Sequence, residues 1–307
     1  MKNNLTDSIV YFGEKLVPFS EANLHIASSA VLQGLSIYTV FPVNKTNNGL
    51  AAFRLEEHFN RLIDSAKIIG IDDFEKNWHY KKFEKAAKEL IKANKVKDDV
   101  FVRVSVHVSE LLPGTRSRGL KTTLSMFVYP AQSIVPRAGA RLKTSVWRRV
   151  PDYAIPARAK VNGAYVNSVL AKQDALDSGY DDCIFLDALG HVCELSAANI
   201  FLVKNNVVIT PDSTSDLLEG INRKTIIELA KNEGYSVEQR TVDLTELYVA
   251  DEVFVCGTSA FVTHVKEIDA RIVGNGKLGN ITEKLSSLHD SLLHGQHDNS
   301  NMYLTSL

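Results

Sequence analysis

A single lysine among small residues is the most informative feature of this 307-residue sequence. Lys160 follows Ala157-Arg158-Ala159, and Tyr165 stands five positions after it. A lysine held in a pocket away from an anionic partner can lose its proton and attack a carbonyl carbon. Glu194, which follows a predicted strand, turn and strand, would supply a carboxylate for a protonated pyridine ring. A lysine and such a carboxylate are the minimum equipment for pyridoxal phosphate chemistry.

Three further segments could bind a phosphate group. Arg61 lies on a predicted helix, in Glu57-His58-Phe59-Asn60-Arg61-Leu62, and points away from its apolar face, toward solvent or an interdomain cleft. The run Leu218 to Arg223 is a glycine turn that leads into a helix, and a helix start offers N–H groups and a positive dipole end to an anion. Asn222 would also suit an N-cap there. Thr258 follows a predicted strand in Cys256-Gly257-Thr258-Ser259-Ala260.

Together, the segments around Lys160 and Glu194 resemble the class IV, branched-chain-type aminotransferases, and the similarity extends from about Tyr11 to Leu293. The resemblance implies that Lys160 forms an aldimine with pyridoxal 5'-phosphate and later shuttles a proton. It implies that Glu194 keeps the ring nitrogen protonated and that Tyr165 donates to the phenolic oxygen of the ring. These three are the catalytic residues that we expect, and all three would also bind the cofactor.

The resemblance also implies how the phosphate and the substrate are held. Arg61, Thr258 and the backbone amides of Ile221 and Asn222 would anchor the phosphate. The residues expected at the substrate are Tyr38, Arg103, Ser259 and Ala260. Arg103 resembles an arginine that accommodates acidic donors such as glutamate. Arg149 also matches a position of the family, but its sequence context assigns it no chemistry.

Several positions depart from the family pattern. Leu195 follows Glu194 where most relatives have glycine, and it would crowd the backbone near the cofactor. The run Tyr38-Thr39-Val40-Phe41-Pro42 stands where branched-chain enzymes usually have Phe-Glu-Gly-Ile-Arg, and Gln33 and Ala131 replace aromatic residues. We expect the last three departures to change the substrate pocket without touching the cofactor machinery.

The resemblance therefore predicts a ping-pong aminotransferase. It would move an amino group from an amino acid, with a branched-chain L-amino acid favoured, to a 2-oxo acid such as 2-oxoglutarate. A D-amino-acid or amine transaminase and an aminodeoxychorismate lyase of the same fold are alternatives. A non-catalytic scaffold that keeps the fold is a further one, motivated by Leu195. A homodimer is also implied.

The elements that must position these residues follow from periodicity and turn signals. We expect an α/β protein of fold type IV. A small α/β domain (residues 1–130), a linker (131–139) and a larger domain of mixed sheet and helices (140–307) would hold the cofactor in the cleft between the domains. The expected strands are Val10–Val17 (a hairpin), Leu32–Val43, Asp99–Ser109, Thr122–Tyr129, Leu142–Arg148, Asp182–Leu195 (a hairpin) and Glu252–Cys256. The expected helices are Arg54–Ile69, Lys82–Asn94, one after Tyr165, Gly220–Asn232 and Ile281–Leu293.

The helix after Tyr165 would bury Val166, Val169, Leu170 and Leu176. The tail after His294 is polar, and only contacts with the rest of the chain would order it.

Composition and charge narrow the classes of partner. Hydrophobic residues make up 45% of the chain and charged residues 23%, which suits a soluble globular protein. The net charge of −1 gives no field that would attract nucleic acid or anionic lipid, so we expect neither as a partner. No apolar run reaches the roughly 20 residues that span a bilayer. The three cysteines lack metal-ligand spacing, and we expect a cytoplasmic protein without a metal site.

Overall fold

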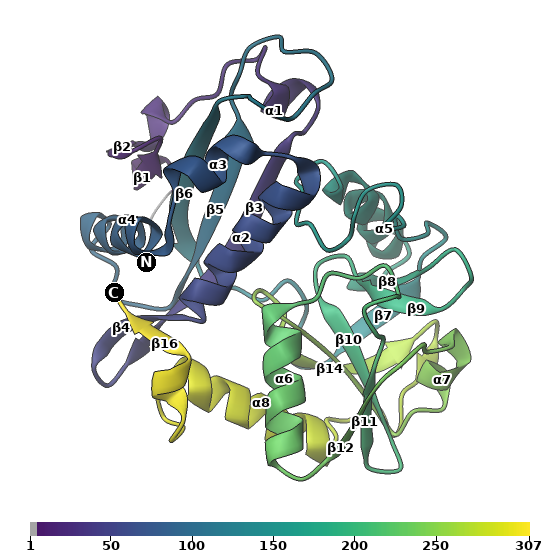
Figure 1. The fold of residues 1–307 in the computed structure, drawn as a ribbon. Helices are drawn as coiled ribbons and strands as arrows, with labels where there is room; N and C mark the ends of the chain where they lie inside the picture. Colours follow the sequence, from purple (N-terminus) through teal and green to yellow (C-terminus); the bar gives the residue numbers. More distant parts are fainter. Residues whose placement is uncertain (1–4) are drawn as a thin grey trace. The chain divides into compact units, whose positions relative to one another are not determined.

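Two compact units can be distinguished in the computed structural model, which describes residues 5–307 (Figure 1). The first unit comprises the chain up to Ala131 together with the segments Ala159–Gly163 and Leu292–Leu307. The second comprises Gln132–Arg158 and Ala164–Ser291. The sequence had led us to group residues 140–307. The segment around Lys160 and the C-terminal segment belong to the first unit because both pair with its strands.

The first unit is built on an antiparallel sheet of seven strands in the order β16-β4-β3-β5-β6-β1-β2. Its strands are β1 (Ile9–Phe12), β2 (Lys15–Pro18), β3 (Ser36–Thr46), β4 (Gly49–Phe53), β5 (Val100–Val108), β6 (Thr122–Pro130) and β16 (Leu304–Ser306). The strand expected at Asp99–Ser109 is confirmed as β5. Its alternating valines are buried, and Phe101 and Ser105 on its other face are buried too. The central part of this sheet is therefore covered on both faces.

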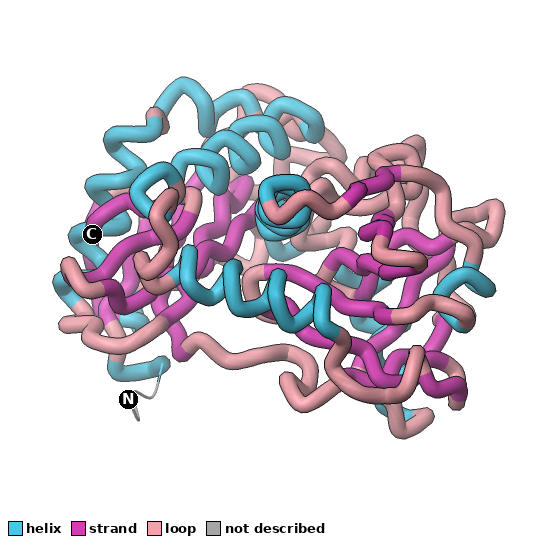
Figure 2. Tube along the Cα trace, turned by 90° about the horizontal axis from the view of Figure 1, so that it is seen from below, coloured by secondary structure: helices cyan, strands magenta, loops and turns pink. Residues whose placement is uncertain are grey.

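Helices α1 (Ser29–Leu32), α2 (Leu55–Ile69), α3 (Asp72–Asn77) and α4 (Tyr80–Ala93) belong to this unit. Helix α2 packs on β3, and α4 packs on β1 and β6, so the helices, cyan in Figure 2, lie against the strands of their unit. The helices expected at Arg54–Ile69 and Lys82–Asn94 are confirmed as α2 and α4, and each buries one apolar face. Helix α3 was not expected, because six residues are too few to show a helical period.

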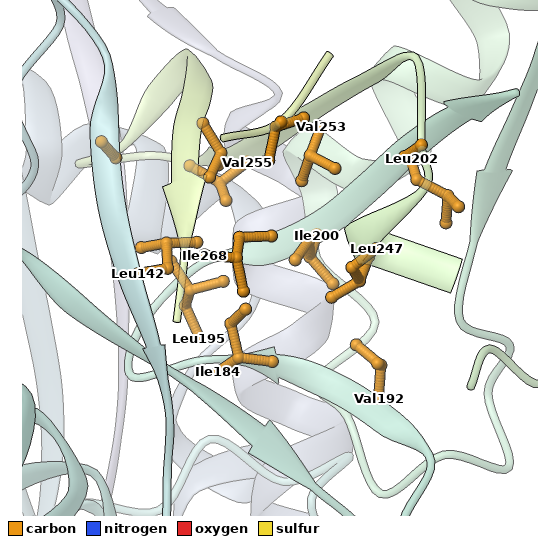
Figure 3. Packing of buried hydrophobic residues seen from close by; sticks show 14 of the residues in the cluster. Leu142, Ile184, Val192, Leu195, Ile200, Leu202, Leu247, Val253, Val255 and Ile268 are labelled. Carbon is orange, nitrogen blue, oxygen red and sulfur yellow. The ribbon is translucent and has the colours of Figure 1, made fainter. Parts of the chain in front are cut away.

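The second unit has a mixed sheet in the order β12-β11-β10-β13-β14-β7-β8-β9. Strand β9 also pairs with β10, so the strands from β10 to β9 form a closed ring. Apolar side chains fill the interior of this ring, and Ile200, Val255 and Ile268 are among them (Figure 3). The strands are β7 (Ala140–Thr144), β8 (Asp182–Leu186), β9 (Val192–Leu195), β10 (Asn199–Lys204), β11 (Val207–Thr210), β12 (Ser236–Gln239), β13 (Glu252–Gly257), β14 (Phe261–Ile268) and β15 (Arg271–Ile272).

The helices of the second unit are α5 (Tyr165–Asp177), α6 (Ile221–Asn232), α7 (Leu244–Tyr248) and α8 (Asn280–Leu293). Short 3-10 turns occur elsewhere, at Leu5–Asp7, Phe19–Glu21 and Ser300–Met302. In the part of the chain that the structure describes, no helix is both long and apolar enough to cross a membrane.

The apolar face expected for α5 is wrong. Val166 and Val169 are 63% and 65% exposed, and Leu170 and Leu176 are exposed as well. The helix instead buries the small residues Ser168, Ala171 and Ala175. Because α5 packs closely on β8, where Phe185 and Cys183 fill the space, only a strip of small side chains fits against the sheet.

Candidate active site

The backbone of Lys160 is held from two sides within the first unit. Its carbonyl accepts a hydrogen bond from the Tyr38 N–H of β3 (3.0 Å), and its own N–H donates to Ser65 Oγ of α2 (3.1 Å). The neighbouring Val161 forms a bridge to Ile37. The half-buried Lys160 Nζ lies 4.8 Å from the centre of the Tyr38 ring. The main chain at Lys160 is therefore held by hydrogen bonds to β3 and to α2.

Two glycines allow this segment to approach the chain before β3. A Cβ atom on Gly34 would lie 3.0 Å from Gly163 Cα, closer than such contacts normally are. Gly34 also has φ of +66°, which favours glycine. The contact holds the end of the Lys160 segment against the start of β3.

Arg103 meets Lys160 at the same aromatic ring. Its guanidinium lies 3.8 Å from the centre of the Tyr38 ring and donates to Asn162 Oδ1 (2.8 Å). Asn162 in turn donates to Ser36 Oγ (2.6 Å). The structure thus brings together Tyr38, Arg103 and Lys160, three of the residues that the sequence led us to expect at the cofactor or the substrate.

Arg61 reaches strand β3, where we had expected solvent or a cleft. Its Nη2 atom donates to Thr39 Oγ1 (2.8 Å), and Thr39 Oγ1 is also 2.8 Å from His58 Nδ1. Burial and the charge of Arg61 hold the pKa of His58 well below its ordinary value. Thr39, which lies in the run that departs from the family pattern, therefore contacts the arginine that we expect at the phosphate.

In the second unit, Glu194 is a buried carboxylate with several donors. Arg149 forms an ion pair with it (2.9 Å), and both side chains are nearly inaccessible to solvent. Asn199 Nδ2 donates to the other carboxylate oxygen (3.2 Å), and the Leu218 N–H donates to Glu194 as well (3.3 Å). A buried carboxylate needs such partners, because desolvation without compensation is costly. The network favours the ionised form, which is the form that can accept a hydrogen bond from a pyridinium N–H.

A β-bulge directs Glu194 out of the core. Ile184 lies opposite Leu195 and Leu186 lies opposite Val192, so β9 has one residue more than β8 between these pairs. Leu195 and Val192 both belong to the core cluster in the ring of strands. The bulge lets Glu194 face outward beside a buried Leu195, so the crowding that we expected from this leucine does not arise.

Arg149, to which the sequence assigned no chemistry, is the charged partner of Glu194. Besides Glu194, it contacts Ser168 Oγ of α5 (3.4 Å), and its guanidinium lies 5.4 Å from the centre of the Phe185 ring. These contacts come from segments far apart in the chain, so no local pattern could have revealed them. Asn199, five positions after Glu194, is the member of this network that lies nearest to Glu194 in the chain.

The two segments of the second unit that we expect at the phosphate are the start of α6 and the Gly257–Thr258 turn after β13, and Asn199 of β10 links them. Gly220 precedes α6, so Asn222 is in the first turn rather than at the N-cap, and its N–H and that of Ile221 have no partner within the helix. A Cβ atom on Gly220 would lie 2.1 Å from Asn199 Oδ1, so the turn packs directly on Asn199. Asn199 is opposite Cys256 in the sheet, and the Gly257–Thr258 turn follows at once.

The remaining expected residues are also in the second unit. Tyr165 is half-buried and begins α5. The Ser259 carbonyl accepts from the Ile134 N–H (2.9 Å), and Ala260 is fully buried. Lys160, Tyr38, Arg103 and Arg61 thus form one group in the first unit, and the other expected residues belong to the second. Among residues 5–307, no group of three or more His, Cys, Asp or Glu side chains could hold a metal ion.

Comparison with known proteins places this geometry in context. Residues 36–268 match the family model described as amino-transferase class IV. The chain is 35% identical to a probable branched-chain-amino-acid aminotransferase of Aquifex aeolicus, over 99% of this chain and 98% of that protein. It is similar to the branched-chain aminotransferase of Thermoproteus uzoniensis with norvaline (TM-score 0.93, 32% identity, 97% and 98% covered). A third match is the branched-chain amino acid aminotransferase of Thermobaculum terrenum in its PLP form (TM-score 0.90, 29% identity, 98% and 99% covered).

Proposed function

The chain belongs to the class IV aminotransferase family, and from that premise we propose that it transfers the amino group of a branched-chain L-amino acid to a 2-oxo acid, with pyridoxal 5'-phosphate as cofactor. The observation that carries the proposal is the fixed main chain at Lys160, whose amine lies over the Tyr38 ring. The names of the relatives support the substrate class.

The donor set of the chain fits this cofactor. An aldehyde calls for an amine, a pyridinium calls for a buried carboxylate, and a phosphate calls for a guanidinium and helix-start amides. Lys160, Glu194, Arg61 and the first turn of α6 provide these groups. When bound, pyridoxal phosphate supplies a carbonyl that accepts an amine and a ring that accepts electrons.

Each residue then has a defined task. Lys160 Nζ holds the cofactor and takes the proton from the α-carbon of the amino acid. The Glu194 carboxylate keeps the proton on the ring nitrogen, and Arg149 holds that carboxylate in its charged form. Tyr165 donates to the phenolic oxygen. Arg61, Thr258 and the amides of Ile221 and Asn222 bind the phosphate.

The residues around Tyr38 support a substrate pocket that accepts both branched and acidic side chains. The Tyr38 ring offers an apolar surface to a branched side chain, and Arg103 offers a fixed guanidinium to the carboxylate of an acidic substrate. The backbone of Ser259 and Ala260 would meet the substrate carboxylate. Replacing Arg103 with Met should raise KM for 2-oxoglutarate by about tenfold or more, with a smaller effect on leucine. Equal changes for both would refute this role.

A visible absorbance spectrum of the cofactor-supplied protein tests the proposal. We expect a band of lysine-bound cofactor that L-leucine bleaches and D-alanine does not. Lys160→Ala should lose both the band and turnover. A response to D-alanine alone would indicate a D-amino-acid enzyme, and near wild-type turnover of Lys160→Ala would refute the mechanism. A protein that never binds the cofactor would be the non-catalytic scaffold.

We further propose that the protein is a homodimer in the cytoplasm. The exposed apolar side chains of α5, Val166 and Val169 foremost, support a face that a second copy covers. The cysteines are free and buried thiols, which suits a reducing compartment. Sedimentation should give a dimer for the wild-type protein and a shift toward monomer for Val169→Glu. A monomeric wild-type protein would refute the dimer.

A further inference from the structure

We propose that Thr39 and His58 form a neutral hydroxyl–imidazole pair that orients the guanidinium of Arg61, which makes Thr39 a positioning residue for anion binding. The inference rests on the proposed function, in which Arg61 binds the phosphate of the cofactor. It goes beyond that function because it assigns a role to Thr39 and His58, two buried side chains to which the proposed mechanism gives no task.

The geometry joins β3 to α2 through a single oxygen atom. Thr39 Oγ1 accepts from Arg61 Nη2 (2.8 Å) and lies 2.8 Å from His58 Nδ1. Thr39 is fully buried and His58 is 1% exposed, so water does not compete for these bonds. Phe41 packs beside the imidazole, with 5.9 Å between the ring centres. Both hydrogen-bonding groups are thus fixed by the packing around them.

The direction of the hydrogen bonds follows from the donors present. Arg61 can only donate, and its Nη2 atom is also 3.4 Å from His58 Nδ1. A proton on Nδ1 would face this donor, so Nδ1 is the acceptor and the Thr39 hydroxyl donates its single proton to it. His58 is then neutral and carries its proton on Nε2. Burial and the nearby charges of Arg61, Lys160 and Arg54, which lower its pKa, agree with this neutral form.

The consequence concerns how Arg61 presents its charge. A guanidinium is a rigid planar fork, so a bond at one nitrogen fixes the direction of the others. Because the Thr39 hydroxyl is neutral, it fixes this direction without cancelling the positive charge. A carboxylate in the same place would compete with a phosphate for the arginine.

The test compares the affinity for pyridoxal phosphate with the affinity for pyridoxal, which lacks the phosphate. Thr39→Val removes the hydroxyl at nearly constant shape, and Thr39→Ser retains it. We expect Thr39→Val to lower the affinity for pyridoxal phosphate by about tenfold, the scale of one hydrogen bond to a charged group. Its affinity for pyridoxal should not change, and Thr39→Ser should resemble the wild-type protein. Arg61→Met should lower the affinity for pyridoxal phosphate at least as much.

The outcomes separate the inference from the proposed function. If Arg61→Met lowers the preference for the phosphorylated cofactor and Thr39→Val does not, the inference is refuted and the proposed function stands. If Arg61→Met has no effect either, the phosphate role of Arg61 fails and the inference fails with it. A second measurement uses the wild-type protein, so it does not depend on whether Thr39→Val folds. Nitrogen-15 NMR of the histidine-labelled protein, with His58→Gln to assign the signals, shows which ring nitrogen of His58 carries the proton. A protonated His58 Nδ1 would overturn the inference.

Discussion

The ion pair between Arg149 and Glu194 makes a quantitative prediction about stability. Removing one partner of a buried pair leaves an uncompensated charge and costs about 3–5 kcal/mol. After Arg149→Met, Glu194 still accepts from Asn199 and from the Leu218 N–H. We therefore expect the lower end of the range, a loss of about 3 kcal/mol in the free energy of unfolding.

Glu194→Gln removes the other charge and should cost a similar amount, because Arg149 then lacks its anion. The double variant Arg149→Met/Glu194→Gln contains neither charge. It should be more stable than the sum of the single effects predicts, with a coupling energy of about 2 kcal/mol, within the range for directly interacting residues. Arg148 provides a matched control, since it is the neighbouring arginine and is exposed.

Urea unfolding of the cofactor-free protein, followed by circular dichroism, measures these free energies. Arg148→Met should stay within about 0.5 kcal/mol of the wild-type protein, as most surface substitutions do. The reasoning is refuted if Arg149→Met costs no more than Arg148→Met, or if the double-variant cycle shows no coupling.

Three other variants follow from the geometry. Gly220→Ala puts a Cβ atom 2.1 Å from Asn199 Oδ1, so it should cost about 1–3 kcal/mol in urea unfolding. In an Asn199→Ala background, which lacks the clashing oxygen, Gly220→Ala should cost less, and an equal cost in both backgrounds would contradict the clash. Burial lowers the pKa of His107 from 6.5 to about 4, so the unfolded chain binds the proton first. His107 should therefore lower the free energy of unfolding by about 3 kcal/mol as the pH falls from 6.5 to 4. The free energy of unfolding of His107→Phe, measured over the same pH range, should lack this contribution. Deleting the chain from Tyr303 onward removes the ring over Arg54 and β16, the strand that pairs with β4. The deletion should speed proteolysis of the first unit, and an unchanged cleavage rate would show that the C-terminal strand does not stabilise this unit.

The sequence predicted best those elements whose periodicity spans several turns or pairs. Helices α2 and α4 and strand β5 could be predicted close to their observed bounds because their apolar residues recur with the helical or strand period. The turn between β10 and β11 is local in the same way, because Asn205 and Asn206 both adopt positive φ, which asparagine tolerates. Such features depend on neighbouring residues, so the chain itself encodes them.

The apolar face of α5 shows where this reasoning fails. Its valines and leucines recur with a helical spacing, but the sheet beneath the helix accepts only small side chains. Periodicity indicates that an apolar face exists, and it cannot tell whether that face meets this chain or a second copy.

The sequence by itself determined the chemistry that this protein has available: a lysine, a carboxylate, a tyrosine and anion-binding turns in the order of the class IV family. Only the tertiary structure decided how they are held. The bulge that turns Glu194 outward, the pairing of Glu194 with Arg149 and the contact of Arg61 with Thr39 all join segments distant in the chain. Local sequence constrains backbone conformation and side-chain type, whereas the partners of a buried charge are set by which strands and helices the packed core brings together.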